Sequence, residues 1–286
     1  MSDQELVAKQ EHVWDSIATL CTPFTEREWK TPTDCPGWSV PDHTPKDMRH
    51  VKNELGRWIE PWVDRCRPWP GARILAEFIT VTRERRRVLD AMSAEEFTRE
   101  FHTPIGSHSM RSFLPIRIFD NWVHEQDIRR AVGHPGHFAG PVAEHALERV
   151  VRAMSFVVGR KVHAAPDTTV VFEVTGALDR TLALGMQGEG PPLMRRPSAD
   201  AVAGNGAPLN TRCAPPSADA VAVGRATPLA QPPALPTVRL TMDVETFVCL
   251  GCGRWAPEPT LASGKVQIAG DRTLAERIVA QMNFMP

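Results

Sequence analysis

The sequence predicts a protein of the α plus α+β class, with an antiparallel helical bundle in residues 1–160 and a small α+β domain in residues 161–286. Two observations lead to this prediction. Apolar residues recur every three or four positions up to about residue 160, as in amphipathic helices, and then alternate with polar residues, as in half-buried strands. The length of 286 residues is also sufficient for two domains that each have a core.

The first half is expected to contain five main helices. Ser2 or Asp3 is a suitable cap for the first, Pro61 would kink or end the second, and Gly159 is a natural end for the fifth. Capping-box patterns at Thr25 and Ser93 predict further short turns. Loops are expected over 31–45, 97–108 and 133–140. The helices are expected at 3–21, 46–66, 70–92, 109–132 and 141–159.

The second half is expected to begin with a β-hairpin whose turn is the GALD segment. Two further strands follow, and each runs directly into a helix, the last of which begins after the capping residue Asp271. Strands with segregated helices indicate a small α+β domain. The strands are expected at 168–176, 180–188, 237–243 and 265–270, and the helices at 244–255 and 271–282.

One segment of the second half has a different composition. The sequence PSADAVA at 197–203 recurs identically at 216–222, among residues that are mostly Pro, Ala and Gly. Such a composition offers little apolar surface to bury. We therefore expect 189–236 to be a disordered insertion that arose by tandem duplication; the alternative is an arm that recognises a partner.

The composition narrows the functional class. A net charge of −1 and a pI near 6.8 do not favour binding to nucleic acid or to an acidic membrane surface. No apolar run approaches the roughly 20 residues of a membrane span, and the N-terminal residues lack the pattern of a signal peptide. Six scattered cysteines do not indicate a disulfide framework. A cytoplasmic protein is the expectation.

The helix at 109–132 carries the most informative pair of residues, Asp120 and His124. They lie four positions apart, so their side chains are neighbours on one helical stripe, which is expected to be buried because Phe113, Ile116 and Val123 share it. A buried carboxylate and imidazole require a partner. A divalent metal would satisfy both, and the alternative is an Asp–His hydrogen bond in the core.

Charged residues that follow this pair have two possible roles. Asp127 lies on the same stripe and could orient the His124 imidazole, as partners of metal-bound histidines do. Glu125 and Asp127 could instead form a solvated, salt-bridged outer face with Arg129 and Arg130.

Other candidate ligands carry weaker signals. Cys249 and Cys252 have the spacing of a redox or zinc motif, but no second cysteine pair exists and they lie inside a predicted helix, which favours a packing role. His43 and His50 are either surface residues or distant metal ligands. No role is assigned to His102, His108, His134 and His137.

Several motifs together resemble the mycothiol-dependent maleylpyruvate isomerase family. They include DCPGWSV at 34–40, WVHEQDIRRAVG at 122–133 and the VETF…CGR segment at 244–254, and the similarity covers nearly the whole chain apart from 189–236. The resemblance implies a DinB-like N-terminal bundle that holds a divalent metal, usually zinc, and a C-terminal domain similar to sterol-carrier proteins. It also implies the thiol cofactor mycothiol and an actinobacterial cytoplasm.

The resemblance also implies roles for individual residues. Asp120 and His124 match two of the metal-ligand positions of the family, and Arg254 has the position of an arginine that would hold a substrate carboxylate. A metal-bound thiol is deprotonated and could add to an electrophilic carbon. The expected activity is therefore isomerisation of an electrophilic small molecule, or transfer of the thiol to it.

One departure from the family pattern concerns the third metal ligand. In the family, WSV leads into a helix with a ligand histidine, whereas here Val40 is followed at once by PDHTPKDMRHVKN, and that helix is missing. Either residues 46–66 replace it and bring His50 to the metal, or this copy is degenerate. A degenerate copy could be a non-catalytic protein that binds a small or lipid-like molecule. A bundle without this helix would also expose apolar side chains of its neighbours.

Overall fold

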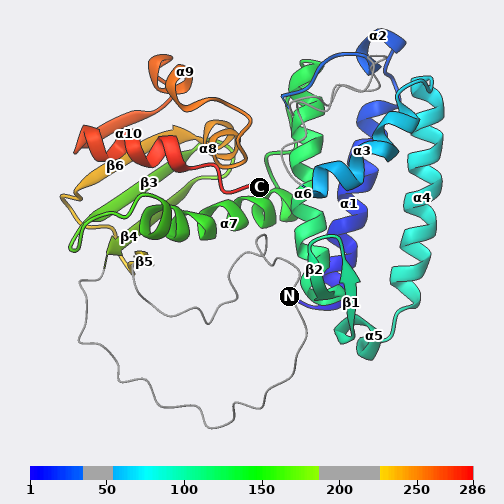
Figure 1. Ribbon diagram of the computed structural model, residues 1–286, viewed down its shortest axis with the longest axis horizontal. Coiled ribbons are helices and arrows are strands. Elements are labelled where there is room, and N and C mark those ends of the chain that lie inside the picture. Colours follow the sequence, from blue (N-terminus) through cyan, green and yellow to red (C-terminus); the bar gives the residue numbers. More distant parts are fainter. Residues whose placement is uncertain (35–53, 187–225, 286) are drawn as a thin grey trace.

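The computed structural model of the chain describes residues 1–34, 54–186 and 226–285 (Figure 1). It confirms the α plus α+β class: a helical part comes first, and a sheet with covering helices follows. Three predictions fall wholly or partly outside the described residues. They are the start of the helix at 46–66, most of the loop at 31–45 and both copies of the repeat. No helix in the described ranges is long and apolar enough to cross a membrane.

The first helix of the bundle begins at the cap that the sequence predicts. Ser2 and Glu5 form a reciprocal capping box at the start of α1, and Ser109 caps α6. Pro61 does not end α3, which continues to Cys66. The helical elements of this half are α1 (Asp3–Cys21), α2 (Glu26–Trp29), α3 (Glu54–Cys66), α4 (Gly71–Ala91), α5 (Ala94–Thr98) and α6 (Met110–Ala131).

The prediction of a loop over 97–108 is wrong, because this stretch contains a small antiparallel hairpin. Strand β1 (Glu100–Thr103) pairs with β2 (Gly106–Ser109), and the Thr103 hydroxyl donates to the Gly106 carbonyl oxygen at 2.7 Å. Gly106 has a φ of +114°, which favours glycine at this position. Strands of four residues are too short to reveal the period of two from which a strand is predicted.

The buried face of α6 is rotated from the predicted stripe. Ile118, Phe119 and Trp122 are almost fully buried, as is Val123 of the predicted stripe, whereas Phe113 and Ile116 are only partly buried. The difference arises because apolar residues surround the first half of the helix, so spacing alone did not determine which face packs inward. Asp120 and His124 therefore lie at the edge of the core, where they are partly accessible to solvent.

Helix α7 (Pro141–Phe156) links the bundle to the sheet (Figure 1). It packs against α6 and α1 on one side and against the sheet domain on the other. The His145 Nε2 atom donates to the Pro115 carbonyl oxygen at 3.0 Å, which joins α7 to α6. Gly159 does not end the helix as expected, since α7 continues into the π-helical turn η2 (Val157–Lys161).

The second half contains a five-stranded sheet in the order β5-β4-β3-β6-β7. The predicted hairpin is confirmed, and β3 also pairs in parallel with β6. The end of the expected insertion is not disordered: Ala226–Pro228 pairs with β4 and forms the edge strand β5, a pairing between distant segments that local composition does not reveal. The strands are β3 (Thr169–Thr175), β4 (Arg180–Met186), β5 (Ala226–Pro228), β6 (Val238–Asp243) and β7 (Gln267–Gly270).

One face of this sheet is buried under helices. Along β6, Val238, Leu240 and Met242 are buried while Arg239 and Thr241 lie on the opposite, partly exposed face. The predicted helices α8 (Val244–Gly251) and α10 (Arg272–Gln281) pack on the strands, and a short helix α9 (Pro257–Ala262) that the sequence did not indicate lies between them in the chain.

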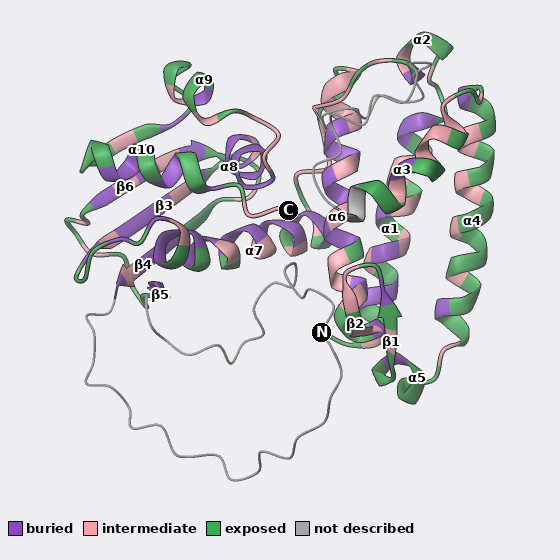
Figure 2. Ribbon diagram, in the orientation of Figure 1, coloured by how far each residue is buried: buried purple, intermediate pink, exposed green. Residues whose placement is uncertain are grey.

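The outer helices of the bundle are less well covered than α6 and α7 (Figure 2). Only Gly71 and Leu89 of α4 are buried. Apolar side chains of α3 and α4 that face solvent are Trp58, Trp62, Val81 and Val88, each more than half exposed. Uncovered apolar side chains therefore accumulate on this side of the described bundle.

Glu125 does not lie on a solvated outer face, as one interpretation of the sequence proposed. Its side chain is fully buried and accepts hydrogen bonds from the Ser16 hydroxyl at 2.6 Å and from Arg129 Nε at 2.8 Å. His137 Nδ1 lies 2.8 Å from Glu125 Oε2. Burial alone would raise the pKa of Glu125, but the hydrogen bonds from His137 and Ser16 outweigh it and lower the pKa. This cluster ties α6 to α1 and to the connector before α7.

Replacing Glu125 should therefore destabilise the bundle. Glu125→Gln removes the charge but keeps the volume, so the free energy of unfolding in urea should fall by about 3–5 kcal/mol, as when one member of a buried ion pair is lost. The matched control is Glu148→Gln, because Glu148 pairs with Arg152 on the surface of α7 at 2.9 Å. The control should change stability by less than about 0.5 kcal/mol. Equal losses in the two variants would contradict a structural role for the cluster.

Candidate functional site

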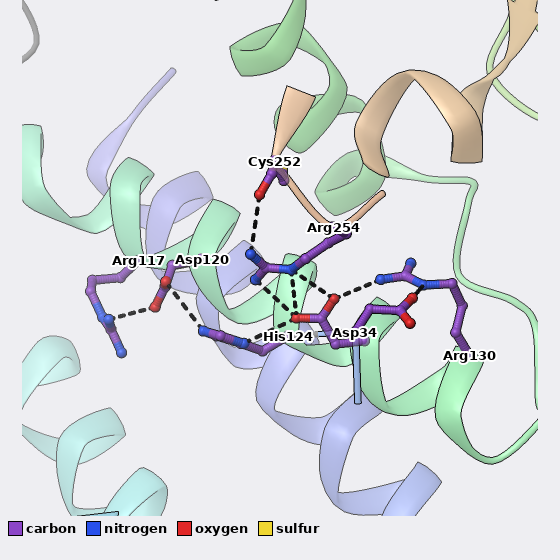
Figure 3. A network of polar contacts seen from close by, with 8 residues as sticks. Asp34, Arg117, Asp120, His124, Arg130, Cys252 and Arg254 are labelled. Atoms are coloured by element: carbon purple, nitrogen blue, oxygen red, sulfur yellow. Dashed lines mark hydrogen bonds and ion pairs between the residues drawn. The ribbon is translucent and has the colours of Figure 1, made fainter. Parts of the chain in front are cut away.

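Helix α6 brings three predicted site residues together. Asp120, His124 and Asp127 follow one another along the helix, with the imidazole between the two carboxylates. Figure 3 shows Asp120 and His124 next to each other. His124 Nε2 lies 3.6 Å from Asp120 Oδ1, and His124 Nδ1 lies 3.3 Å from Asp127 Oδ2. Each ring nitrogen therefore faces a different carboxylate, which is an arrangement that can fix both the orientation and the tautomer of the ring.

The two carboxylates have different environments. The Asp120 side chain is 28% exposed and forms an ion pair with Arg117 Nη1 at 2.6 Å. The Asp127 side chain is only 2% exposed. Burial alone would raise the pKa of Asp127, but hydrogen bonds from His124 and Arg254 hold the pKa below its ordinary value of 3.8. Asp127 is thus a permanently charged group at neutral pH, while Asp120 is accessible to an incoming cation.

Arg254 reaches this site from the sheet domain. Its Nε atom lies 3.0 Å from Asp127 Oδ1, and its Nη2 atom lies 2.9 Å from Asp127 Oδ2, which makes the contact bidentate. Arg254 Nη1 also donates to the Cys252 carbonyl oxygen at 3.2 Å. The sequence predicted that Arg254 lies near the site. It did not predict that the guanidinium group would be bound to Asp127.

Arg130 extends the network towards the start of the chain. Its Nη2 atom donates to Asp127 Oδ1 and its Nε atom donates to Asp34 Oδ2, both at 2.6 Å (Figure 3). Asp34 is the last described residue before the segment that contains His50. The sequence interpretation that placed Arg130 on an outer, solvated ion pair is corrected, because the Arg130 and Asp127 side chains are both largely buried.

The imidazole of His124 lies between two carboxylates, each of which also pairs with arginine. Burial of His124 on its own would lower its pKa, but the hydrogen bond to Asp127 and the charge of Asp120 outweigh burial and raise the pKa above its ordinary value of 6.5. The same pair of carboxylates that favours a proton on His124 would also favour a metal cation, because both are positive charges attracted to the same position.

The described residues supply two candidate metal ligands and no third. Within residues 1–34, 54–186 and 226–285, no group of three or more His, Cys, Asp or Glu side chains could hold a metal ion. The predicted ligands Asp120 and His124 are adjacent, as expected. His50, the predicted candidate for a third ligand, lies outside the described residues, as does His43.

Besides the Arg254–Asp127 contact, sequence reasoning missed two further ion pairs of the site. The Arg117–Asp120 pair has i, i+3 spacing on a helix, so its signal was present but was not used. The Arg130–Asp34 pair joins residues far apart in the chain and carried no local signal.

The predicted packing role of the cysteine pair agrees with the structure. Cys249 is fully buried at the end of α8, and Cys252 is 2% exposed just beyond it. Burial raises the pKa of the Cys249 thiol and raises that of Cys252 to about 12, so both remain protonated at neutral pH. Neither thiol is a candidate nucleophile.

Comparison with known families supports the resemblance seen in the sequence. Residues 41–129 match the family model described as the mycothiol maleylpyruvate isomerase N-terminal domain. The matched range contains Asp120, His124 and Asp127, so the motif on α6 lies within the recognised part of the chain. The family resemblance predicted from the sequence is thereby confirmed.

Two solved structures share the fold. One is the crystal structure of the mycothiol-dependent maleylpyruvate isomerase, and the other is that of a variant in which alanine replaces a histidine. Each aligns over 94% of this chain and 93% of its own, with a TM-score of 0.52 and 11% sequence identity. At that identity the likeness concerns the fold alone. No curated protein matches the sequence.

The raised pKa of His124 leads to a pH-dependent stability in the metal-free protein. A histidine whose pKa is higher in the folded state stabilises the fold fully below its unfolded value of about 6.5, and loses this contribution as the pH rises through the folded value. The difference in unfolding free energy between wild type and His124→Gln, measured in EDTA, should therefore decrease as the pH rises from about 5.5 to 8.5.

His145 provides a control of opposite sign. Burial lowers its pKa below 6.5, so the neutral imidazole is the form that the fold favours. The stability of wild type relative to His145→Gln should consequently increase with pH over the same range. A flat profile for His124→Gln would contradict the carboxylate environment described for His124.

Proposed function

We propose that this protein is a metal-dependent, mycothiol-using isomerase or thiol transferase that acts on a small electrophilic substrate. The observation that carries the proposal is the His124 imidazole held between Asp120 and Asp127, at the junction of the bundle with the sheet domain. The match of residues 41–129 to the mycothiol maleylpyruvate isomerase N-terminal domain supports the choice of thiol.

Asp120 and His124 fit a divalent metal in part. Zinc accepts both carboxylate oxygen and imidazole nitrogen as ligands, and the two candidate atoms lie 3.6 Å apart, close enough to bind one ion. The second ring nitrogen of His124 faces Asp127, which is the usual partner arrangement of a metal-bound histidine. A further ligand would have to come from solvent, from the thiol or from a residue such as His50.

The chemistry follows from the bound ion and from the charges around it. A bound zinc ion would supply a thiol in its nucleophilic, deprotonated form at neutral pH. Asp120 and His124 would hold the ion, and a thiol bound there would supply the nucleophile for the reversible addition to a double bond on which cis–trans isomerisation depends. The same nucleophile would serve a thiol transferase, in which the addition to the substrate carbon would be retained and the substrate would take up a proton.

The role of Arg254 as the group that holds a substrate carboxylate is harder to reconcile with its contacts. The Nε–Nη2 edge, which would make a bidentate contact, is bound to Asp127. A substrate carboxylate would have to displace Asp127 from that edge, leaving a buried carboxylate with one arginine fewer.

One contact favours a second candidate function. Arg117 already neutralises Asp120 at 2.6 Å, so the carboxylate has a cationic partner without a metal. A family member that has lost its metal and its catalytic activity, and that retains only binding of a small molecule, would be expected to contain such a pair. A measurement of whether the protein binds zinc distinguishes the metal-dependent function from the metal-free one.

Zinc should bind the isolated protein and stabilise it. Protein purified without a chelating tag should contain or take up about one equivalent of zinc. Zinc at a hundredfold excess over its dissociation constant should raise the free energy of unfolding by about 2.7 kcal/mol, because only the folded state binds it. Asp120→Ala should abolish this increase, as measured by thermal or urea unfolding with and without zinc.

The matched control is Asp64→Ala. Asp64 near the end of α3 also forms an i, i+3 pair, with Arg67 just beyond the helix, and no histidine of the described residues is paired with it, so zinc should stabilise this variant as it does wild type. Wild type should also accelerate the mycothiol-dependent isomerisation of a cis-enedioate, and Asp120→Ala should not. Wild-type protein that neither contains nor takes up zinc would disprove the metal-dependent function and support the second candidate.

A further inference from the structure

Asp127 is the point at which three distant parts of the chain meet. It lies on α6, Arg254 contacts it from the turn after α8, and Arg130 connects it to Asp34 before α3 (Figure 3). His124 lies 3.3 Å away on the same helix. The carboxylate therefore joins the candidate metal ligand to the sheet domain and to the N-terminal segment.

Both oxygens of Asp127 are fully occupied. Oδ1 accepts from Arg130 Nη2 at 2.6 Å and from Arg254 Nε at 3.0 Å. Oδ2 accepts from Arg254 Nη2 at 2.9 Å and faces His124 Nδ1 at 3.3 Å. With the side chain 2% exposed, water has little access to replace any of these contacts. The direction in which Asp127 presents Oδ2 to His124 is thus determined by the two arginines.

The guanidinium group of Arg254 is itself held in a defined position. The Arg254 amide donates to the Cys249 carbonyl oxygen at 2.8 Å, and Nη1 donates to the Cys252 carbonyl oxygen at 3.2 Å. Gly253 permits the turn, because its φ is +66° and a Cβ there would lie 2.5 Å from the Asn283 side chain. A side chain anchored at both ends can orient the carboxylate that it contacts.

We infer that Arg254 is a positioning residue, which acts through Asp127 to hold the His124 imidazole with Nε2 directed at Asp120. This inference rests on the proposed metal site and assigns Arg254 a role other than binding substrate. The sheet domain thereby contributes to metal affinity without supplying a ligand. A histidine that binds metal through one nitrogen depends on the acceptor at its other nitrogen, and loss of such an acceptor typically weakens metal binding 10- to 100-fold.

The inference is tested by measuring zinc affinity in the absence of substrate and thiol. Arg254→Met removes the charge and the donors but keeps the length of the side chain. Its zinc dissociation constant, measured by competition with a chromophoric chelator, should be about 10- to 100-fold higher than that of the wild type. Arg254→Lys should weaken binding as well, because a lysine cannot make the bidentate contact. If Arg254→Met does not fold, the zinc dissociation constant of Arg254→Lys tests the inference instead.

Two further variants show whether Arg254 acts through Asp127. Asp127→Asn should weaken zinc binding, and the double variant Asp127→Asn with Arg254→Met should weaken it no more than the stronger single change, because both remove the same effect. The matched control is Arg239→Met. Arg239 is bound to Glu173 on the sheet, far from α6 in the fold, so its loss should leave zinc affinity unchanged.

The outcomes distinguish the inference from the function on which it rests. If wild type binds zinc and Arg254→Met binds it equally well, the inference is overturned while the metal site stands. Unchanged zinc affinity together with lost binding of a dicarboxylate such as maleate would identify Arg254 as a substrate ligand. Additive losses in the double variant would likewise overturn action through Asp127. Absence of zinc binding by wild type would overturn the proposed function and the inference with it.

Discussion

The buried charge of Asp127 is the constraint on which the junction between the two halves depends. A carboxylate that is 2% exposed must be compensated by cations, since leaving it unpaired would cost several kcal/mol. Arg130 and Arg254 meet this requirement, and in doing so they bring the turn after α8 and the segment at Asp34 against α6. The position of the His124 imidazole follows from the same requirement, so the fold of the junction and the geometry of the candidate site have one cause.

The elements that the sequence predicts well are those with local signals. Helix α1 follows from its capping residue and from apolar spacing, α4 and α6 follow from apolar spacing, and the β3–β4 hairpin follows from alternation around a turn. Elements that depend on distant partners could not be predicted. Strand β5 has three residues, and only its pairing with β4 distinguishes it from the surrounding Pro- and Ala-rich segment.

The candidate site likewise has features that local spacing predicts and features that depend on distant segments. The adjacency of Asp120 and His124 is a property of one helix and was predictable from i, i+4 spacing. The contact of Arg254 with Asp127 joins distant segments, so helical spacing could place Asp127, and the family resemblance Arg254, near the site without revealing that they bind each other. The burial of Glu125 was not predictable either, because its acceptor role depends on Ser16 and His137 from other segments.

The buried cysteines have a consequence for chemical compatibility. A protein that handles a nucleophilic thiol and an electrophilic substrate risks alkylation of its own side chains. Cys21, Cys249 and Cys252 are buried, and burial raises the pKa of each thiol, so none offers a reactive thiolate. Cys249 and Cys252, which precede Arg254 in the chain, can therefore fill the core without offering a thiolate to an electrophile of the proposed kind, and packing alone suppresses self-inactivation at those positions.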